Sequence, residues 1–352
     1  MSVYKKVQIV CWSIVLVVLL GFSIWFLVNI NLGSWNVFSG IESLNGPYNE
    51  VARYSLDSSK IKNLRVSWLA GDIIISPYNE NDILIVEYAQ RELKENEYIK
   101  LDSRGNLLNV NYSKRNINML IPAKKLEVFV PEELAKELKN VIIDRTSSDL
   151  KIYDIVAEEI DLESSSGDSF LKNIKATKVD IDMTSGDVQL HDSDISRLHI
   201  SASSGDSILN KSEISSLFVN STSGKITIND LVGEEISINT TSGDSKLEQV
   251  ITNKASFDST SGAVKFYGSF KTLRGDSTSG NHYITSDTVP ESFRFNTSSG
   301  DITLVLPEFD DFNISYDTAS GDLESELPII KKGKSRYKVN TSSGDLTIKK
   351  LD

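Results

Sequence analysis

Thiol chemistry is almost absent from this chain of 352 residues, because its only cysteine, Cys11, lies inside an apolar segment. Disulfides within the chain are therefore excluded as a source of stability. Histidine is also scarce. His191, His199 and His282 lie in separate copies of the repeat described below, so the sequence indicates neither a zinc site nor a Ser/His/Asp triad, and we expect them at solvated strand positions.

Basic residues are outnumbered, with 37 Lys and Arg against 49 Asp and Glu. The resulting net charge of −12 repels phosphate backbones and argues against nucleic acid as a partner. Only 7 prolines are present, while serine, threonine, aspartate, asparagine and β-branched residues are abundant. This composition suits short strands joined by polar turns.

Charged residues are missing from the segment 7–30, VQIVCWSIVLVVLLGFSIWFLVNI, which is long enough to cross a bilayer core as a helix. Lys5 and Lys6 precede it, and no basic residue follows until Arg53. The positive-inside rule then places the N-terminus in the cytoplasm. A cleaved signal peptide is the alternative, but no A-x-A-like site follows. We predict a single-pass cell-membrane protein with a cytoplasmic tail at 1–6, a transmembrane helix at 7–30 and an extracytoplasmic bulk.

A short motif, Ser/Thr-Ser-Gly-Asp, recurs through the second half of the chain. Its successive glycines are 19 residues apart five times, and then 18, 20, 21 and 23 residues apart. The glycines are Gly167, Gly186, Gly205, Gly224, Gly243, Gly262, Gly280, Gly300, Gly321 and Gly344. Ser148, in TSSDL, lies 19 residues before Gly167 and is interpreted as a degenerate earlier copy. Such regular spacing indicates stacked structural repeats.

Apolar residues alternate with polar ones on both sides of each glycine. Leu198 and Ile200, for example, lie seven and five residues before Gly205, and Leu209 lies four residues after it. Alternation with period two is typical of a strand with one buried face, so each copy predicts a strand, a glycine turn and a second strand. A unit of 19 residues cannot bury its apolar face alone, and neighbouring units must therefore stack.

The recurring turn residues within the repeat have separate expected roles. We expect the glycine to adopt a positive φ and the serine before it to hydrogen-bond along the stack or close the turn. The aspartate after it is expected to accept local backbone N–H groups in an Asx-type turn. The predicted fold is all-β: a parallel β-helix or flattened β-solenoid of about ten rungs, preceded by a β-rich cap and one N-terminal transmembrane helix. An antiparallel β-sandwich, with each motif at a hairpin tip, is the alternative.

The remaining segments complete the predicted domain organisation. The repeat occupies 147–352, and residues 61–146 form a β-rich cap in which PEELAKEL, 131–138, is a short helix or turn. Residues 31–60 are polar and rich in turn formers, which indicates a membrane-proximal linker. The lysines of the closing DLTIKK are expected to protect the last strand edge.

Three stretches resemble a known bacterial family: the SGD copies, the KKLEVFVPEEL run that leads into TSSDL, and the closing YKVNTSSGDLTIKK. The family consists of putative-adhesin or β-strand-repeat domains of unknown function and includes LiaG-like membrane-anchored envelope proteins. The resemblance covers roughly residues 60–350. It implies a cell-surface β-repeat architecture with one N-terminal helix, and it supplies no catalytic residue.

The motifs predict no catalytic residue, metal or cofactor. The aspartates after the glycines are spread along the whole stack, whereas a glycosidase needs two carboxylates that face one cleft. A calcium ladder is disfavoured, because Lys225, Ala263 and Asn281 replace three of these aspartates.

A candidate ligand surface lies six residues before the glycine, on the solvent side of the predicted strand. His199 and Phe218 occupy this position in two adjacent copies, and Arg274 and Arg294 occupy it in two others. Aromatic and guanidinium side chains of this kind can bind glycans or anionic wall polymer.

Three functions are compatible with these features. The favoured hypothesis is a membrane-anchored, non-enzymatic, adhesin-like module that binds cell-wall polymer, glycan or another membrane protein at the envelope. The second is an accessory protein of envelope-stress signalling, whose membrane helix pairs with a neighbouring membrane protein. The third is a polysaccharide-acting β-helix enzyme.

Overall fold

The computed structural model describes residues 47–113, 124–310, 312–330 and 336–351. Contacts divide the chain into two units, Met1–Pro47 and Tyr48–Asp352, and all described strands belong to the second. The predicted cytoplasmic tail and transmembrane helix, 1–6 and 7–30, lie outside the described residues. Among the residues that are described, no helix is long and apolar enough to span a membrane.

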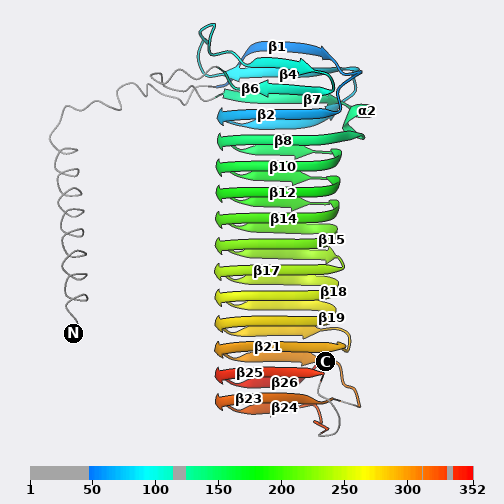
Figure 1. Cartoon of the computed structure of the whole chain (residues 1–352), viewed down its shortest axis with the longest axis vertical. Coiled ribbons are helices and arrows are strands. Elements are labelled where there is room, and N and C mark those ends of the chain that lie inside the picture. Colours follow the sequence, from blue (N-terminus) through cyan, green and yellow to red (C-terminus); the bar gives the residue numbers. More distant parts are fainter. Residues whose placement is uncertain (1–46, 114–123, 311, 331–335, 352) are drawn as a thin grey trace, which may run out of the picture. The chain divides into compact units, whose positions relative to one another are not determined.

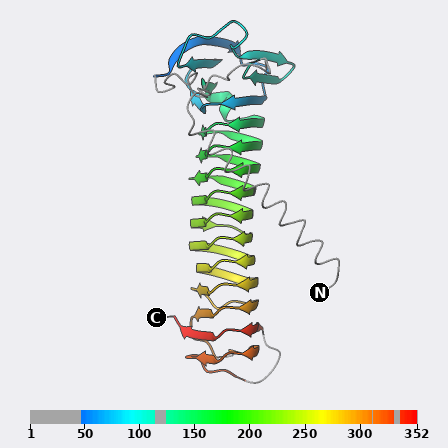
Figure 2. The same ribbon diagram turned by 90° about the vertical axis from the view of Figure 1, so that its left-hand side faces the viewer.

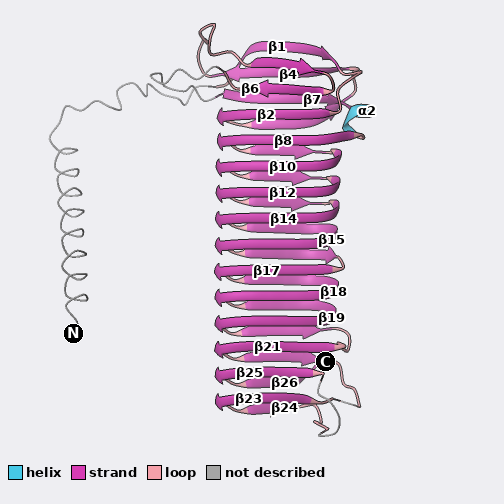
Figure 3. Ribbon diagram, in the orientation of Figure 1, coloured by secondary structure: helices cyan, strands magenta, loops and turns pink. Residues whose placement is uncertain are grey.

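The first part of the second unit contains seven strands and one short helix (Figure 3). These are β1 (Asn49–Asp57), β2 (Asn63–Ala70), β3 (Ile73–Tyr78), β4 (Asp82–Ala89), β5 (Lys100–Arg104), β6 (Leu107–Asn111), β7 (Lys124–Pro131) and α2 (Glu132–Ala135). The helix confirms the prediction for PEELAKEL. Pro131 precedes its first turn with a φ of −48°, Glu132 and Glu133 lie at its positive N-terminal end, and Leu134 is buried.

In the repeat region a long strand ends at each glycine turn and a shorter strand begins after it, and three of the shorter strands continue without a break into the next long strand. The strands of this region are β8 (Leu138–Ser147), β9 (Leu150–Tyr153), β10 (Val156–Ser166), β11 (Ser169–Lys172), β12 (Lys175–Ser185), β13 (Val188–His191), β14 (Asp194–Ser204), β15 (Ser207–Ser223), β16 (Ile226–Val232), β17 (Glu235–Ser242), β18 (Ser245–Ser261), β19 (Val264–Ser279), β20 (His282–Ser286), β21 (Ser292–Ser299), β22 (Ile302–Leu306), β23 (Ile314–Ser320), β24 (Leu323–Ser325), β25 (Tyr337–Ser343) and β26 (Leu346–Lys350).

Successive rungs of the repeat pair in parallel and in register, one above another (Figures 1 and 2). Between β12 and β14, for example, Val179 lies beside Leu198 and Ile181 beside Ile200, and all four side chains are fully buried. Burial of each such side chain contributes roughly 1.5–3 kcal/mol. The two layers of strands enclose one continuous core. The prediction of a parallel β-solenoid is confirmed, and the antiparallel sandwich is wrong.

The glycine turn forms one corner of each of the ten repeat copies, and all ten predicted glycines have a positive φ, between 104° and 156°. A second constraint acts at Gly205, where an added Cβ would lie 2.0 Å from the carbonyl oxygen of Gly186 in the neighbouring rung. Glycine is therefore required at this corner both for its backbone conformation and for the close approach of successive turns.

A second corner, which the sequence did not reveal, lies six residues after the glycine position. In six consecutive rungs the residue there is not glycine, yet it has a left-handed φ of 50–55°. These residues are Asp154, Asn173, Asp192, Lys211, Asp230 and Gln249. Asp and Asn tolerate this conformation better than other residues with side chains, which accounts for four of the six.

The aspartates after the glycines bind differently from the prediction. Asp187 Oδ1 accepts the backbone N–H of Asp206 at 2.7 Å, and Asp168 Oδ1 accepts that of Asp187 at 2.8 Å. The predicted local Asx-type turn is wrong, because each carboxylate reaches the backbone of the neighbouring rung. The serines confirm their prediction, since Ser204 Oγ donates to Thr184 O in the preceding rung at 3.4 Å.

The N-terminal end of the stack is closed by a change of strand direction. β2 pairs in parallel with β6 and β8, and β3 with β7 and β9, so β2 and β3 form a rung in register with the repeat. Beyond them, β4 pairs antiparallel with β7, β1 antiparallel with β4, and β5 antiparallel with β6. The parallel stack thus extends into the predicted cap at 61–146. Part of the predicted linker at 31–60 also folds, because β1 joins the antiparallel sheet that closes this end.

The C-terminal end is closed by rungs that are out of sequence order. β25 lies between β21 and β23, and β26 lies between β22 and β24 (Figure 1). The last rung of the chain is therefore internal. The expectation that the lysines of DLTIKK protect the final edge is wrong, because β23 and β24 form the last rung in space.

Candidate functional site

A shallow groove of about 570 Å³ runs along the outward face of the long strands. Five consecutive rungs line it, from the one that contains Ser201 to the one that contains Thr278. A second hollow, of about 600 Å³, continues it towards the N-terminal end of the stack, and the two share Ser201. The groove is open to solvent along its length.

Two columns of polar side chains form the walls of the groove. Exposed hydroxyl groups lie two residues before the glycines, as in Thr222, Thr241 and Thr260. Amides and carboxylates lie four residues before them, and Asn239 Nδ2 donates to Asn220 Oδ1 at 2.8 Å. Because the rungs are in register, both groups repeat at the strand spacing of about 4.8 Å.

The floor of the groove lies between the two walls, three positions before each glycine. The side chains of this column point inward and are largely buried, so they contribute little exposed surface to the groove. In the central rungs the column holds small residues such as Ser221, whose Oγ donates to Ser223 O at 3.2 Å. Towards the N-terminal end it holds the larger buried side chains of Trp68, Arg145 and Met183.

Arg145 is a buried cation that the sequence did not reveal, with 5% of its surface exposed. Its guanidinium donates to the carbonyl oxygens of Ser148 at 3.0 Å and Asp168 at 2.8 Å, and also to Ser169 Oγ. Desolvation lowers the pKa of Arg145 to about 10. Its position in the repeat could have predicted its burial, because Arg145 precedes Ser148 by three residues and so belongs to the inward column.

The four predicted ligand residues lie in the column beside the groove. His199 is in register with Phe218, and Arg274 with Arg294. Phe218 is 36% exposed, His199 Nε2 lies 2.9 Å from Asn220 Nδ2, and Arg274 Nε donates to Asp276 at 2.8 Å. The structure thus brings each pair together on adjacent rungs. Their role in binding a ligand stays a prediction.

Carboxylates also line the groove, and Asp276 is held by hydrogen bonds from neighbouring side chains, which is typical of a structural role. Asp276 accepts from Arg274 and, at 2.7 Å, from Asn296 Nδ2. Within the described ranges, no group of three or more His, Cys, Asp and Glu side chains is placed to hold a metal ion. The groove therefore presents polar side chains that repeat from rung to rung.

His282 lies in the core and not at the solvated position that the sequence predicted, with 2% of its surface exposed. Its Nδ1 accepts the backbone N–H of Val264 at 3.3 Å, and its ring lies 4.6 Å from that of Phe295. Desolvation lowers the pKa of His282 to about 4. The ring is therefore neutral in the folded protein at neutral pH and takes the place of an apolar residue.

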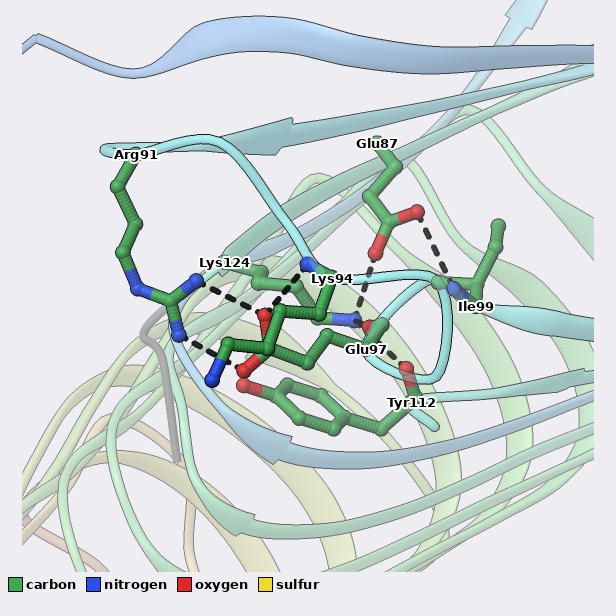
Figure 4. Close-up of polar contacts among 7 residues, drawn as sticks. All are labelled: Glu87, Arg91, Lys94, Glu97, Ile99, Tyr112 and Lys124. Carbon is green, nitrogen blue, oxygen red and sulfur yellow. Dashed lines mark hydrogen bonds and ion pairs between the residues drawn. The ribbon is translucent and has the colours of Figure 1, made fainter. Parts of the chain in front are cut away.

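A buried ion pair lies at the N-terminal end of the stack (Figure 4). Lys124 and Glu87 are both fully buried, and Lys124 Nζ donates to Glu87 Oε1 at 2.6 Å. The same Nζ donates to the carbonyl oxygens of Glu97 at 2.8 Å and Tyr112 at 2.6 Å. All three N–H donors of the ammonium group are thus satisfied, so Lys124 has a structural role and is not a free nucleophile.

Further hydrogen bonds surround this ion pair. Glu87 Oε2 accepts the backbone N–H of Ile99 at 3.2 Å, and Arg91 donates to both carboxylate oxygens of Glu97 at 2.8 Å. The Arg91 hydrogen bonds lower the pKa of Glu97 to about 2. Desolvation lowers the pKa of Lys124, although the hydrogen bond that it donates to Glu87 opposes that effect. One feature of the sequence could have predicted the burial of Lys124, which continues the buried alternation of Leu126 and Val128.

Three solved bacterial structures match the chain at low similarity. They are a putative cell adhesion protein from Clostridium sporogenes (9% identity, TM-score 0.19, covering 87% of this chain and 100% of that one), a putative adhesin from Bacteroides fragilis (13%, 0.35, 85% and 96%) and a putative adhesin from Parabacteroides distasonis (11%, 0.35, 88% and 98%). None of the curated proteins matches the chain.

The family comparison is more specific. The model of one family, Toastrack DUF4097, matches residues 61–230 and again residues 198–349. The two matches overlap and together span the rungs of the solenoid from β2 to β26. This chain therefore belongs to the Toastrack DUF4097 family.

Proposed function

We propose that this protein is a non-catalytic binding module of the cell envelope, which holds an extended, hydroxyl-rich polymer such as a wall polysaccharide lengthwise in the groove. The observation that carries the proposal is a column of exposed hydroxyl groups that repeats over five rungs at constant register, beside a column of Ser, Asn and Asp side chains. A compact ligand would use only a few of these groups. A long sugar chain repeats its own hydroxyl groups at a regular interval and can use them all.

The chemistry of the groove favours a neutral or weakly charged polymer. Its central walls consist of hydroxyl and amide groups such as Thr241 and Asn239, which both donate and accept hydrogen bonds. Asp258 and Asp276 add acceptors, while the nearby Arg274 already donates to Asp276. Many weak contacts along one chain produce avidity without any single deep pocket.

Binding of purified cell-wall polysaccharide to the detergent-solubilised full chain tests this proposal. Thr241→Trp fills the middle of the groove and should weaken binding by at least tenfold in a co-sedimentation assay. Thr227→Trp provides the matched control, because Thr227 points outward from β16 on the other layer of the stack and should leave binding unchanged. Equal affinities of the two variants for the polysaccharide would contradict the proposal. Failure of the wild-type chain to bind any wall fraction would also contradict it.

Catalysis is tested in the same samples, because release of new reducing ends from the polymer would show an enzyme instead of a binding module. We also propose that residues 7–30 anchor the protein in the cell membrane with the solenoid outside. Extraction of membranes at alkaline pH checks this part, since an anchored chain stays in the pellet. Recovery of the chain in the supernatant contradicts the anchor and leaves the groove proposal untouched.

A further inference from the structure

The last two rungs of the solenoid lie in reverse order of the sequence. Phe293 in β21 is in register with Tyr337 in β25, and Tyr337 is in register with Ile314 in β23. The glycine column shows the same order, because an added Cβ on Gly344 would meet Gly300 O, and one on Gly321 would meet Gly344 O. The C-terminal rung, β25 and β26, is thus inserted between two rungs that are adjacent in the sequence.

The side chains explain why this order is favoured. The C-terminal rung buries Tyr337, Val339, Leu346 and Ile348 completely, so it gains from neighbours on both sides. The rung of β23 and β24 is poorer in apolar groups. Its Leu323 is 38% exposed, and its last strand ends in the exposed residues Glu324 and Ser325. A polar rung of this kind serves best at the end of the stack.

Specific contacts hold the inserted rung in place. Tyr337 Oη donates to Pro290 O at 2.5 Å, and the Tyr337 ring lies 5.4 Å from that of the buried Phe312. On its other side, Tyr316 Oη in β23 donates to Gly344 O at 2.6 Å. The inserted rung is therefore bound to both of the rungs that it separates.

The same columns also permit direct contact between the two separated rungs. Because every rung uses one register, Ile314 can take the place of Tyr337 beside Phe293, and Ser320 that of Ser343 beside Ser299. The connection 307–313 has seven residues and reaches at most about 23 Å, whereas skipping one rung requires only about 10 Å. The connection is long enough for either arrangement.

We propose that the C-terminal rung is an insertion lock: when it is absent or withdrawn, β23 and β24 close directly onto β21 and β22 in the same register. The stack then shortens by one rung and keeps its polar end. The locked arrangement is favoured because it buries the apolar face of β25 and β26. A factor that captured residues 337–352 would shift the protein to the shorter arrangement.

Cysteine crosslinking in the full chain, with Cys11→Ser, distinguishes the two arrangements. Asn296, Asn340 and Asp317 occupy one outward column in this spatial order. Neighbouring rungs are close enough for a disulfide, whereas rungs two apart exceed its limit of about 7 Å. We expect Asn296→Cys/Asn340→Cys to crosslink and Asn296→Cys/Asp317→Cys to remain reduced.

Deletion of 337–352 should reverse the second result, so that Asn296→Cys/Asp317→Cys then crosslinks. A pair in the middle of the stack on the layer opposite the groove, Thr227→Cys/Lys246→Cys, should crosslink with or without the deletion and reports that the solenoid has folded. A full-length variant, Ile348→Asp, weakens insertion without shortening the chain and should give partial crosslinking in the Asn296→Cys/Asp317→Cys background.

Two results would overturn the lock. In the first, the middle pair crosslinks in both weakened chains while the cysteines introduced at positions 296 and 317 stay reduced. In the second, the middle pair no longer crosslinks after the deletion, which would make the last rung a requirement for folding and not a lock. The same variants leave the groove of the central rungs intact, so their outcome is independent of polymer binding.

Discussion

The two ends of this solenoid solve the same physical problem in different ways. A parallel stack of similar rungs leaves an open edge at each end, where another strand could pair. The N-terminal end switches to antiparallel pairing in β4, β1 and β5 and encloses the buried ion pair of Lys124 and Glu87. The C-terminal end keeps the parallel direction and places its most polar rung last. Closure thus depends on an ion pair at one end and on rung order at the other.

The largest effect is expected from breaking the ion pair at the N-terminal end. Glu87→Gln leaves the fully buried Lys124 without a counter-charge and should lower the free energy of unfolding by about 3–5 kcal/mol. Chemical denaturation of the full chain measures this change, and hydrogen exchange should show the loss in β2–β7 before the repeat.

Two further variants sharpen that result. Glu87→Leu combined with Lys124→Met removes both charges and should be more stable than Glu87→Gln. Glu137→Gln removes one partner of an exposed pair with Lys62 and should change the free energy of unfolding by less than about 1 kcal/mol. If Glu87→Gln lowers the free energy of unfolding no more than Glu137→Gln does, the buried ion pair does not stabilise the N-terminal end.

An acid-dependent loss of stability is expected nearer the C-terminal end. His282 has a folded pKa of about 4, below its ordinary value of 6.5, so the unfolded chain binds a proton more readily. The contribution of neutral His282 to the free energy of unfolding is fully present above pH 6.5. It is lost as the pH falls towards 4, by about 3 kcal/mol in all. Hydrogen exchange in acid should therefore show β20–β22 opening before β2–β4.

His282→Val removes this titration while keeping a residue type found at the same position of a neighbouring rung, Val264. The unfolding free energy of the wild type minus that of this variant should then decrease as the pH falls from 6.5 to 4. Val264→Ala, a change in the neighbouring core position that removes no titrating group, should leave the pH dependence unchanged. A constant difference for His282→Val across this range contradicts the assignment.

The smallest effect on stability is expected in the middle of the stack, far from the ion pair at one end and the inserted rung at the other. Asp206→Ala removes the acceptor for the backbone N–H of Lys225 and should lower the free energy of unfolding by about 1 kcal/mol. The reverse change is available at Ala263, where the carboxylate is missing from the column, and Ala263→Asp should stabilise the protein by a similar or smaller amount. Effects of the same sign in both variants would show that the cross-rung bonds do not stabilise the stack.

Much of the fold could be predicted from the sequence, because each rung of a solenoid contacts mainly its two neighbours. The spacing of the glycines and the alternation around Leu198 and Ile200 were sufficient to predict parallel rungs, their buried face and the pairing of His199 with Phe218. The groove was only partly foreseen, since the sequence indicated the column that borders it but not the hollow between its hydroxyl and amide columns.

Only the tertiary structure decided the features that depend on partners distant in the sequence. The register of one rung is compatible with every other rung, so local pattern cannot show that β25 precedes β23 in space. The burial of Lys124 and His282 depends on which strands cover them, and the aspartates could bond equally well to their own turn or to the next. The repeating pattern therefore determined how rungs stack, whereas long-range packing determined where the stack begins, where it ends and which polar groups it encloses.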